Sequence, residues 1–296
     1  MKKTLLFLLL LCLAPQWANA SPTQFYLEDV IGDNLKARIY VAADTTAQSQ
    51  VQDALYRATD HAKATFAKLN VNNPDSEVSQ INQKKTAGTF TLSAELAKAI
   101  ETAQSVSKQT DGFFDITFNS PSGNYKSLKI DTKNNVLTIK ENNVTIDLRY
   151  ILSGFLADLI AEDLSNAGWK NALVKVDETY VANGNDISEP WKIPVLTPTN
   201  TIAKRALLYR STDTAAATLG SKQLQDIINP KTKSAVTSDL KLVTIFTKGA
   251  AKAQGTSAGI YAMGREDGKI FLLRHSEFRG VFGDNTGTLT NIPEFK

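Results

Sequence analysis

The sequence predicts an α+β protein arranged around a central strand–helix–strand unit. Three observations carry this prediction. Apolar and polar residues alternate over 144–148, which is the period of a half-buried strand. Over residues 151–164 the apolar residues recur at helical spacing, and Gly168 follows, where glycine adopts a left-handed conformation most easily. Residues 172–176 then alternate as a strand again, so both turns of the unit are expected at the rim of a sheet.

The first twenty residues have the pattern of a signal peptide. Lys2 and Lys3 precede an apolar run over residues 5–13, and the small residues 18–20 suit a signal peptidase. The run is too short to anchor the chain stably in a membrane. We therefore expect cleavage after Ala20, a periplasmic location, and one mature domain over residues 21–296.

Composition excludes several classes of function. Cys12 is the only cysteine, and it lies in the apolar run without the small preceding residue that a lipoprotein signal needs. A mature chain without cysteine excludes disulfides, thiol nucleophiles and thiolate metal sites. Loss of Lys2 and Lys3 leaves 31 basic residues against 30 acidic ones, a formal charge of +1. Such a chain has no basic field to attract nucleic acid.

The other elements are predicted from periodicity and turn residues. A hairpin is expected over residues 24–42, turning at residues 32–34. A long amphipathic helix over 51–69 is expected to begin with Asp44 as N-cap, and a second helix to run from Ser93 to the Asp-Gly pair at 111–112. Further strands are expected near residues 127–131, 136–140, 191–196, 206–210, 240–246, 270–274 and 279–282, with a small-residue helix over 250–263.

Generic catalytic motifs are absent. The sequence has no P-loop, no dinucleotide-binding glycine pattern and no HExxH. Its two histidines are His61, beside the apolar stripe of the first helix, and His275, expected at the end of a strand. Neither context suggests the carboxylate partner that a serine triad needs, so structural roles are expected for both.

Six short stretches occur in an informative order. They are residues 74–82, 110–117, 146–148, 215–220, 227–233 and 253–264. Together they resemble the ApbE family, the periplasmic FAD:protein FMN transferases, over roughly residues 39–264. The resemblance implies two α+β lobes around a cleft. It also implies magnesium-dependent cleavage of the FAD pyrophosphate and transfer of FMN to a threonine of a partner protein.

The resemblance also implies a set of site residues. Those expected at the cofactor are Ser76, Glu77, Asp115, Asp147, Thr218 and Asn229. Those expected at the cation are Gln254, Thr256 and Ser257. A structural alternative stays open for each of these residues. Ser76 and Glu77 suit caps, Asp115 a turn, and Asp147 a cap on the following helix. Thr218 and Asn229 suit satisfied polar contacts, and Gln254, Thr256 and Ser257 suit helix packing.

Two turns depart from the family pattern. Arg149 and Tyr150 stand where the family has two glycines, and Asp177 and Glu178 replace two glycines of the neighbouring turn. Glycine lets the backbone approach a ligand closely, so these side chains reduce the space for a pyrophosphate. If the family arrangement holds, Arg149 is expected to pair with the two acids across the cleft.

The cation segment departs as well. Gln254 stands where the family has an aspartate, and Ala258 where it has a threonine. Magnesium prefers carboxylates and phosphate oxygens. We therefore expect a non-catalytic family member that retains neither FAD nor magnesium and binds a partner or small ligand. One alternative is an active transferase acting on a periplasmic redox protein or flavoprotein; an acceptor of covalent FMN has no convincing motif.

Overall fold

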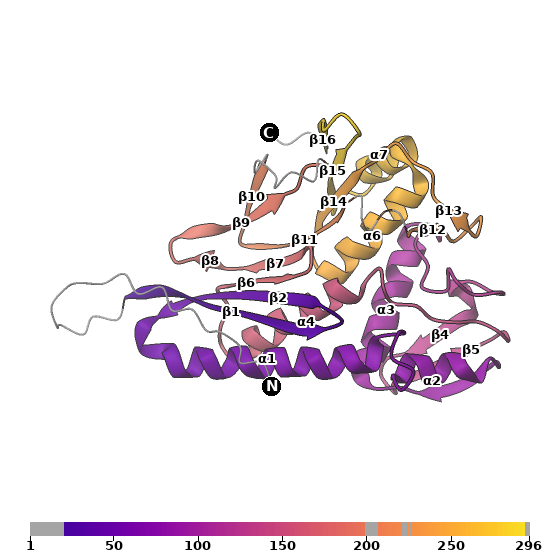
Figure 1. Cartoon of the computed structure of the whole chain (residues 1–296), viewed down its shortest axis with the longest axis horizontal. Helices are drawn as coiled ribbons and strands as arrows, with labels where there is room; N and C mark the ends of the chain where they lie inside the picture. Colours follow the sequence, from indigo (N-terminus) through magenta and orange to yellow (C-terminus); the bar gives the residue numbers. More distant parts are fainter. Residues whose placement is uncertain (1–20, 199–206, 221–223, 225, 294–296) are drawn as a thin grey trace.

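A computed structural model of the chain describes residues 21–198, 207–220, 224 and 226–293, so the predicted signal peptide lies outside the described residues. Its main feature is an eight-stranded sheet in the order β1-β2-β6-β7-β11-β14-β15-β16 (Figure 1). Every neighbouring pair in this sheet is antiparallel. The strands are β1 (Pro22–Gly32), β2 (Leu35–Asp44), β6 (Ala172–Val176), β7 (Thr179–Asn183), β11 (Asp213–Gly220), β14 (Leu242–Thr247), β15 (Arg279–Gly283) and β16 (Leu289–Ile292).

Helices cover one face of this sheet. The helix α1 (Gln48–Leu69) packs on β1, α4 (Leu152–Asn166) on β6, and α6 (Ala250–Met263) on β11 and β14. Further out, α3 (Ala94–Gln109) and α7 (Arg265–Arg274) pack against α6, while α2 (Glu77–Lys84) follows α1 (Figure 1). One apolar core forms around α1 and α4, and a second around α3 and α6, with Leu152 in contact with both.

Three smaller sheets complete the fold. One of them lies across the opposite face of the large sheet, where Trp191 and Ile193 are buried with Tyr180 and Ala182 of β7. The smaller sheets consist of β8 (Asn185–Asp186), β9 (Glu189–Val195) and β10 (Leu207–Ser211); of β3 (Gly88–Thr91), β4 (Leu128–Asp131) and β5 (Val136–Ile139); and of β12 (Ile228–Asn229) and β13 (Ser234–Ala235). The α+β class is therefore as predicted.

Most of the predicted elements are confirmed. The first hairpin turns at Asp33 and Asn34, which both have positive φ (46° and 66°), as a tight turn between twisted strands requires. Ser93 caps α3 by accepting a hydrogen bond from the Leu96 amide. Gly168, with φ 95°, follows the end of α4. These local signals required no knowledge of the tertiary structure.

The predicted strand over residues 144–148 is wrong, so the central unit consists of irregular chain, helix and strand. In the segment 144–148, the Asp147 amide donates to the Ile116 carbonyl at 2.8 Å, and other backbone hydrogen bonds go to side chains. Asn82 exchanges two 2.8 Å bonds with the amide and carbonyl of Ile146. Ser120 does the same with Thr145, at 2.8 and 2.9 Å. The alternating apolar residues are buried, but no neighbouring strand pairs with them.

Two smaller predictions are also wrong. Residues 270–274 belong to helix α7, so His275 ends a helix and not a strand. The N-cap of α1 is Ala47, whereas Asp44 precedes a short 3₁₀ turn and its side chain makes no capping bond. No helix within the described ranges is long and apolar enough to cross a membrane.

Candidate functional site

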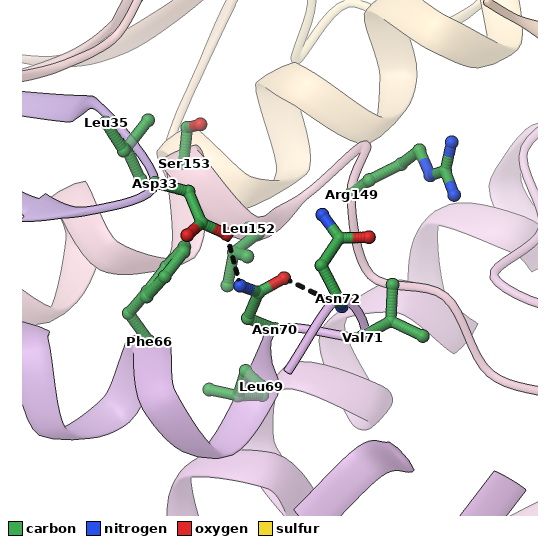
Figure 2. A pocket seen from close by; sticks show the side chains of 10 residues that line it. All are labelled: Asp33, Leu35, Phe66, Leu69, Asn70, Val71, Asn72, Arg149, Leu152 and Ser153. Carbon is green, nitrogen blue, oxygen red and sulfur yellow. Dashed lines mark hydrogen bonds between the residues drawn. The ribbon is translucent and has the colours of Figure 1, made fainter. Parts of the chain in front are cut away.

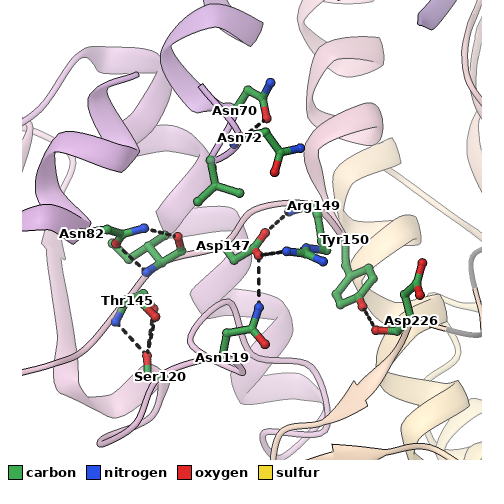
Figure 3. Close-up of polar contacts among 12 residues, drawn as sticks. Asn70, Asn72, Asn82, Asn119, Ser120, Thr145, Asp147, Arg149, Tyr150 and Asp226 are labelled. Carbon is green, nitrogen blue, oxygen red and sulfur yellow. Dashed lines mark hydrogen bonds and ion pairs between the residues drawn. The ribbon is translucent and has the colours of Figure 1, made fainter. Parts of the chain in front are cut away.

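The turn that precedes α4 is organised by Asp147. This carboxylate is 5% exposed. Its Oδ1 accepts from the Arg149 amide at 3.0 Å, and its Oδ2 accepts from Arg149 Nε at 2.8 Å and Nη2 at 2.6 Å (Figure 3). Asn119 Nδ2 adds a longer bond of 3.4 Å. Asp147 therefore closes its own turn and does not cap α4, because the N-cap of that helix is Ile151, without a side-chain bond.

The expected pairing of Arg149 with Asp177 and Glu178 is wrong. Arg149 binds Asp147, only two residues away, and this contact raises the pKa of the guanidinium. Glu178 instead lies 3.1 Å from Lys175 on its own hairpin. Each charged side chain is therefore paired within its own turn or hairpin.

Tyr150 joins the same turn to two other segments. Its ring lies 5.1 Å from the ring of Phe118, and its hydroxyl donates to the carbonyl of Asp226. Burial raises the pKa of Tyr150 to about 12, so the phenol stays protonated and can donate. The guanidinium of Arg149 lies 5.5 Å from the same Phe118 ring, and Lys233 Nζ donates to the Phe118 carbonyl at 3.2 Å. The segments 115–120, 147–150 and 226–233 are thus held together by side chains.

Three cofactor candidates near this turn and α2 have structural partners. Asp115 accepts at one oxygen from the amide and hydroxyl of Thr117, at 2.7 and 2.8 Å, and at the other from the Tyr125 amide at 2.9 Å. Ser76 caps α2, as its structural alternative predicts. Glu77 accepts from the amide and hydroxyl of Ser93, at 2.7 and 2.6 Å. The caps and turns expected as alternatives are therefore present.

The other two cofactor candidates lie apart from each other. Thr218 is buried on β11, and its hydroxyl is 2.8 Å from that of Thr244 on β14. Asn229 accepts from the Lys231 amide at 2.9 Å and donates to the Ala262 carbonyl at 3.3 Å. Asn229 belongs to the segment that contacts Phe118, so the structure places it near the turn of Asp147, whereas Thr218 lies within the large sheet.

The three cation candidates belong to α6 and are buried in its packing. Gln254 Oε1 accepts from the amide of Gly154 at 2.8 Å. Ser257 donates to the carbonyls of Ala253 and Ala217, at 2.9 and 3.2 Å. Thr256 is fully buried, and its hydroxyl has no hydrogen-bond partner. Within the part of the chain that the structure describes, no three His, Cys, Asp or Glu residues are grouped to hold a metal ion.

The start of α6 is bound by Asp158, an acid of α4. Asp158 accepts from the amides of Ala250 and Ala251, at 2.7 and 2.9 Å. Burial raises its pKa to about 6, although the two amides and Lys98 act in the opposite direction. Only the tertiary contact between α4 and α6 reveals this residue. It holds the N-terminus of α6 against α4.

A small pocket lies beside the turn. Its volume is about 200 Å³, below the range of about 300–1,000 Å³ of drug-sized ligand pockets. Asn70 joins two of its sides, since its Nδ2 donates to Asp33 at 2.5 Å and its Oδ1 accepts from the Asn72 amide at 3.0 Å (Figure 2). The lining residues are Asp33, Leu35, Phe66, Leu69, Asn70, Val71, Asn72, Arg149, Leu152 and Ser153.

His61 does have carboxylate partners, contrary to the expectation from its sequence context. Its Nδ1 lies 2.7 Å from Asp163, and its Nε2 lies 3.6 Å from Glu95. These contacts join α1, α3 and α4. No hydrogen bond between His61 and a serine occurs among the residues described, so the arrangement is that of a structural contact between helices.

The order and spacing of these elements match a known family. The ApbE family model matches residues 35–282. The chain belongs to the ApbE family. A FAD:protein FMN transferase of Haemophilus influenzae is 25% identical over 246 residues, covering 69% of this chain and 70% of that protein. One of Salmonella typhimurium is 22% identical over 308 residues, covering 90% and 87%.

Solved ApbE structures have the same fold. The flavin transferase ApbE of Vibrio cholerae gives a TM-score of 0.75 at 19% identity, covering 92% of this chain and 97% of that one. The ApbE protein of Thermotoga maritima gives 0.77 at 19% identity, with the same coverage. The family predicted from the six stretches is therefore confirmed.

The residues present fit magnesium and FAD poorly. Gln254 brings no charge, and its amide oxygen already accepts from Gly154. Thr256 and Ser257 bring hydroxyls alone, whereas Mg²⁺ prefers carboxylates and phosphate oxygens in an octahedral shell. The turn carries the two large side chains of Arg149 and Tyr150, both bound to protein partners, whereas glycine would let a pyrophosphate approach the backbone closely.

Proposed function

We propose that this chain is an exported ApbE-family protein that does not transfer flavin and acts by binding a partner or a small ligand. One observation carries the proposal. The retained acid Asp147 is occupied by Arg149, and the oxygen of Gln254 is occupied by the Gly154 amide. Neither group is free to hold a cation in this arrangement.

Phosphoryl chemistry makes these contacts important. Cleavage of a pyrophosphate needs a cation, or fixed donors, at the oxygens where charge develops. Those oxygens also need backbone that can approach them closely. Here the guanidinium of Arg149 is directed to Asp147, and the hydroxyl of Tyr150 to the Asp226 carbonyl. Function has to be inferred from such a site and not from the fold alone.

Export and the partner are part of the same proposal. Residues 1–20 have the pattern of a cleaved signal, and the family acts on partner proteins, so a periplasmic redox protein or flavoprotein is the proposed partner class. Mass spectrometry of the periplasmic fraction is expected to find a chain that begins at Ser21 without lipid. A chain acylated at Cys12, or retained at full length in the cytoplasm, contradicts export.

An active FAD:protein FMN transferase is the second candidate. The family match over residues 35–282 and the relatives of that name favour it. The unpartnered hydroxyl of Thr256 also favours it, because a buried oxygen without a partner could contribute to a rearranged cation site.

The release of AMP from FAD separates the two candidates. The mature protein is incubated with FAD and Mg²⁺, with an EDTA sample as blank and the Vibrio cholerae flavin transferase as positive control. We expect AMP at the level of the blank. Sustained Mg²⁺-dependent AMP release by the unmodified protein contradicts the proposal and favours the transferase.

A further inference from the structure

We propose that the side chains of Arg149 and Tyr150 occupy the turn at which the resemblance places the cofactor. They stabilise the fold in the absence of flavin and cation. The two side chains stand where the sequence resemblance implies glycines, and they contact the segments 115–120 and 226–233. The proposal concerns the stability and the accessibility of this turn. It holds or fails independently of whether the protein releases AMP.

The first argument is electrostatic. Asp147 is 5% exposed, and a buried carboxylate without a partner is costly. Its Oδ2 receives both Nε and Nη2 of Arg149, a charge-assisted pair of donors from one guanidinium. No other basic side chain within the described ranges forms an ion pair with Asp147. Arg149 therefore supplies the one positive charge that contacts this carboxylate among the described ion pairs.

The second argument is packing. Figure 3 shows Arg149 and Tyr150 leaving the turn in different directions. The Arg149 guanidinium lies near the ring of Phe118, which is 2% exposed, and Tyr150 packs against the same ring at 5.1 Å. Tyr150 then continues to the Asp226 carbonyl. Glycine at these two positions can make none of these contacts, so the three segments would keep the links through Lys233 and Asn119 and lose those through Arg149 and Tyr150.

Arg149 also borders the space beside the turn. The pocket that Arg149 lines has a volume of about 200 Å³, with Asn72 between the arginine and the Asp33–Asn70 pair (Figure 2). A dinucleotide needs a far larger cleft than this. Removal of the side chains of Arg149 and Tyr150 is therefore expected both to destabilise the fold and to open the turn to flavin.

Melting temperatures in EDTA test the electrostatic part. Arg149→Met keeps the aliphatic stem and removes the charge, and we expect it to lower the melting temperature by roughly 5 °C. Arg149→Lys is expected to lower the melting temperature by less, because it keeps the positive charge. Asp147→Asn combined with Arg149→Met is expected to recover at least half of the loss, because the unpaired charge is then absent. Arg57→Met, in an exposed pair with Asp53, is the matched control and is expected to change the midpoint by less than about 1 °C.

The double variant Arg149→Gly with Tyr150→Gly tests whether these two side chains occupy the turn and exclude flavin from it. We expect it to melt below the unmodified protein, and to bind FAD at least about tenfold more tightly, measured by flavin fluorescence in a titration. The proposal requires both results. An unchanged melting temperature in the Arg149 variants, or FAD affinity that is equal in the unmodified and double-glycine proteins, overturns it.

Discussion

Two segments of this chain carry positions of family motifs, and they differ from the family in opposite ways. The turn 147–150 has large polar side chains at positions where the sequence resemblance implies glycine, and these side chains bridge neighbouring segments. The α6 segment 254–258 has a neutral amide and an alanine at positions where the resemblance implies cation ligands, and it is buried throughout. The turn is held by contacts of large side chains, and the α6 segment by close packing of small ones.

The difference shows how each segment maintains its structure. The turn depends on a charged pair and an aromatic contact close to the surface, where Arg149 remains 46% exposed. The α6 segment depends on close helix packing and on one buried amide that satisfies a helix N-terminus. Substitutions on α6 are therefore expected to affect stability more than substitutions in the turn.

The largest effect is expected from Gly154→Ala. A Cβ at this position lies 2.6 Å from the Ala251 nitrogen and close to the backbone of Ala250, which cannot move aside as a flexible side chain can. Overpacking against backbone is expected to reduce the free energy of unfolding by about 3 kcal/mol or more. Chemical denaturation of the variant and the unmodified protein measures this difference in the free energy of unfolding. Gly88→Ala is the matched control, because its Cβ meets only Phe90 at 3.8 Å; an equal loss in both variants contradicts the packing argument.

The next effect is a pH dependence from Asp158. Its pKa is raised by burial from 3.8 to about 6, so the folded state binds this proton more tightly than the unfolded state. The contribution to stability is full below pH about 4 and is lost as pH rises through about 6. The change is at most about 3 kcal/mol. Asp158→Asn is expected to remove this part of the dependence of unfolding free energy on pH. Asp60 is an exposed acid on α1, and Asp60→Asn is expected to leave the dependence unchanged. Identical pH profiles of stability for Asp158→Asn and the unmodified protein contradict the account.

Gln254 gives a smaller and more specific effect. Gly154 is the third residue of α4, so its amide has no partner within the helix and depends on the Gln254 oxygen. Gln254→Met is expected to cost about 1–3 kcal/mol, because a buried donor is left unsatisfied. Gln254→Glu keeps an acceptor oxygen and is expected to cost less. Equal losses in both variants indicate that the amide's size matters and not its hydrogen bond.

The sequence predicted most of the fold because many elements here are specified locally. Ser93, the Asp33–Asn34 turn and Gly168 each act through their own backbone conformation. The segment 144–148 was mispredicted because alternation reports which side chains are buried. It does not report whether the hydrogen bonds go to a strand or to Asn82 and Ser120. Residues 270–274 form a short apolar run, for which helix and strand cannot be separated by period.

The site was predictable only in part. Motif order selected the turn of Asp147 and the segment of Gln254 as candidates, and the structure shows the hydrogen bonds that their side chains make. The partners of these residues could not be predicted, since Arg149 has acids available both locally and across the fold. The contact of Asp158 with Ala250 and the contact of His61 with Asp163 join residues 92 and 102 positions apart in the chain, so no short-range pattern indicates them.

The smallest stability effect is expected from Tyr150→Phe. The ring and its contact with Phe118 remain, and only the hydrogen bond to the Asp226 carbonyl is lost. The expected cost is about 1 kcal/mol, measured by denaturation. Tyr150→Gly is expected to cost more because the ring contact is lost too. Equal costs contradict the bridging role of the ring.

Melting of the unmodified protein with FAD and Mg²⁺ together is the most direct test of whether the cofactor site persists. A ligand at about one hundred times its dissociation constant stabilises the folded state by about 2.7 kcal/mol. For a chain of this size that amounts to a rise of roughly 5–10 °C. Because Arg149 is paired with Asp147 and Gln254 accepts from the Gly154 amide, we predict a change in melting temperature within about 1 °C. A Mg²⁺-dependent rise of 5 °C or more contradicts the account.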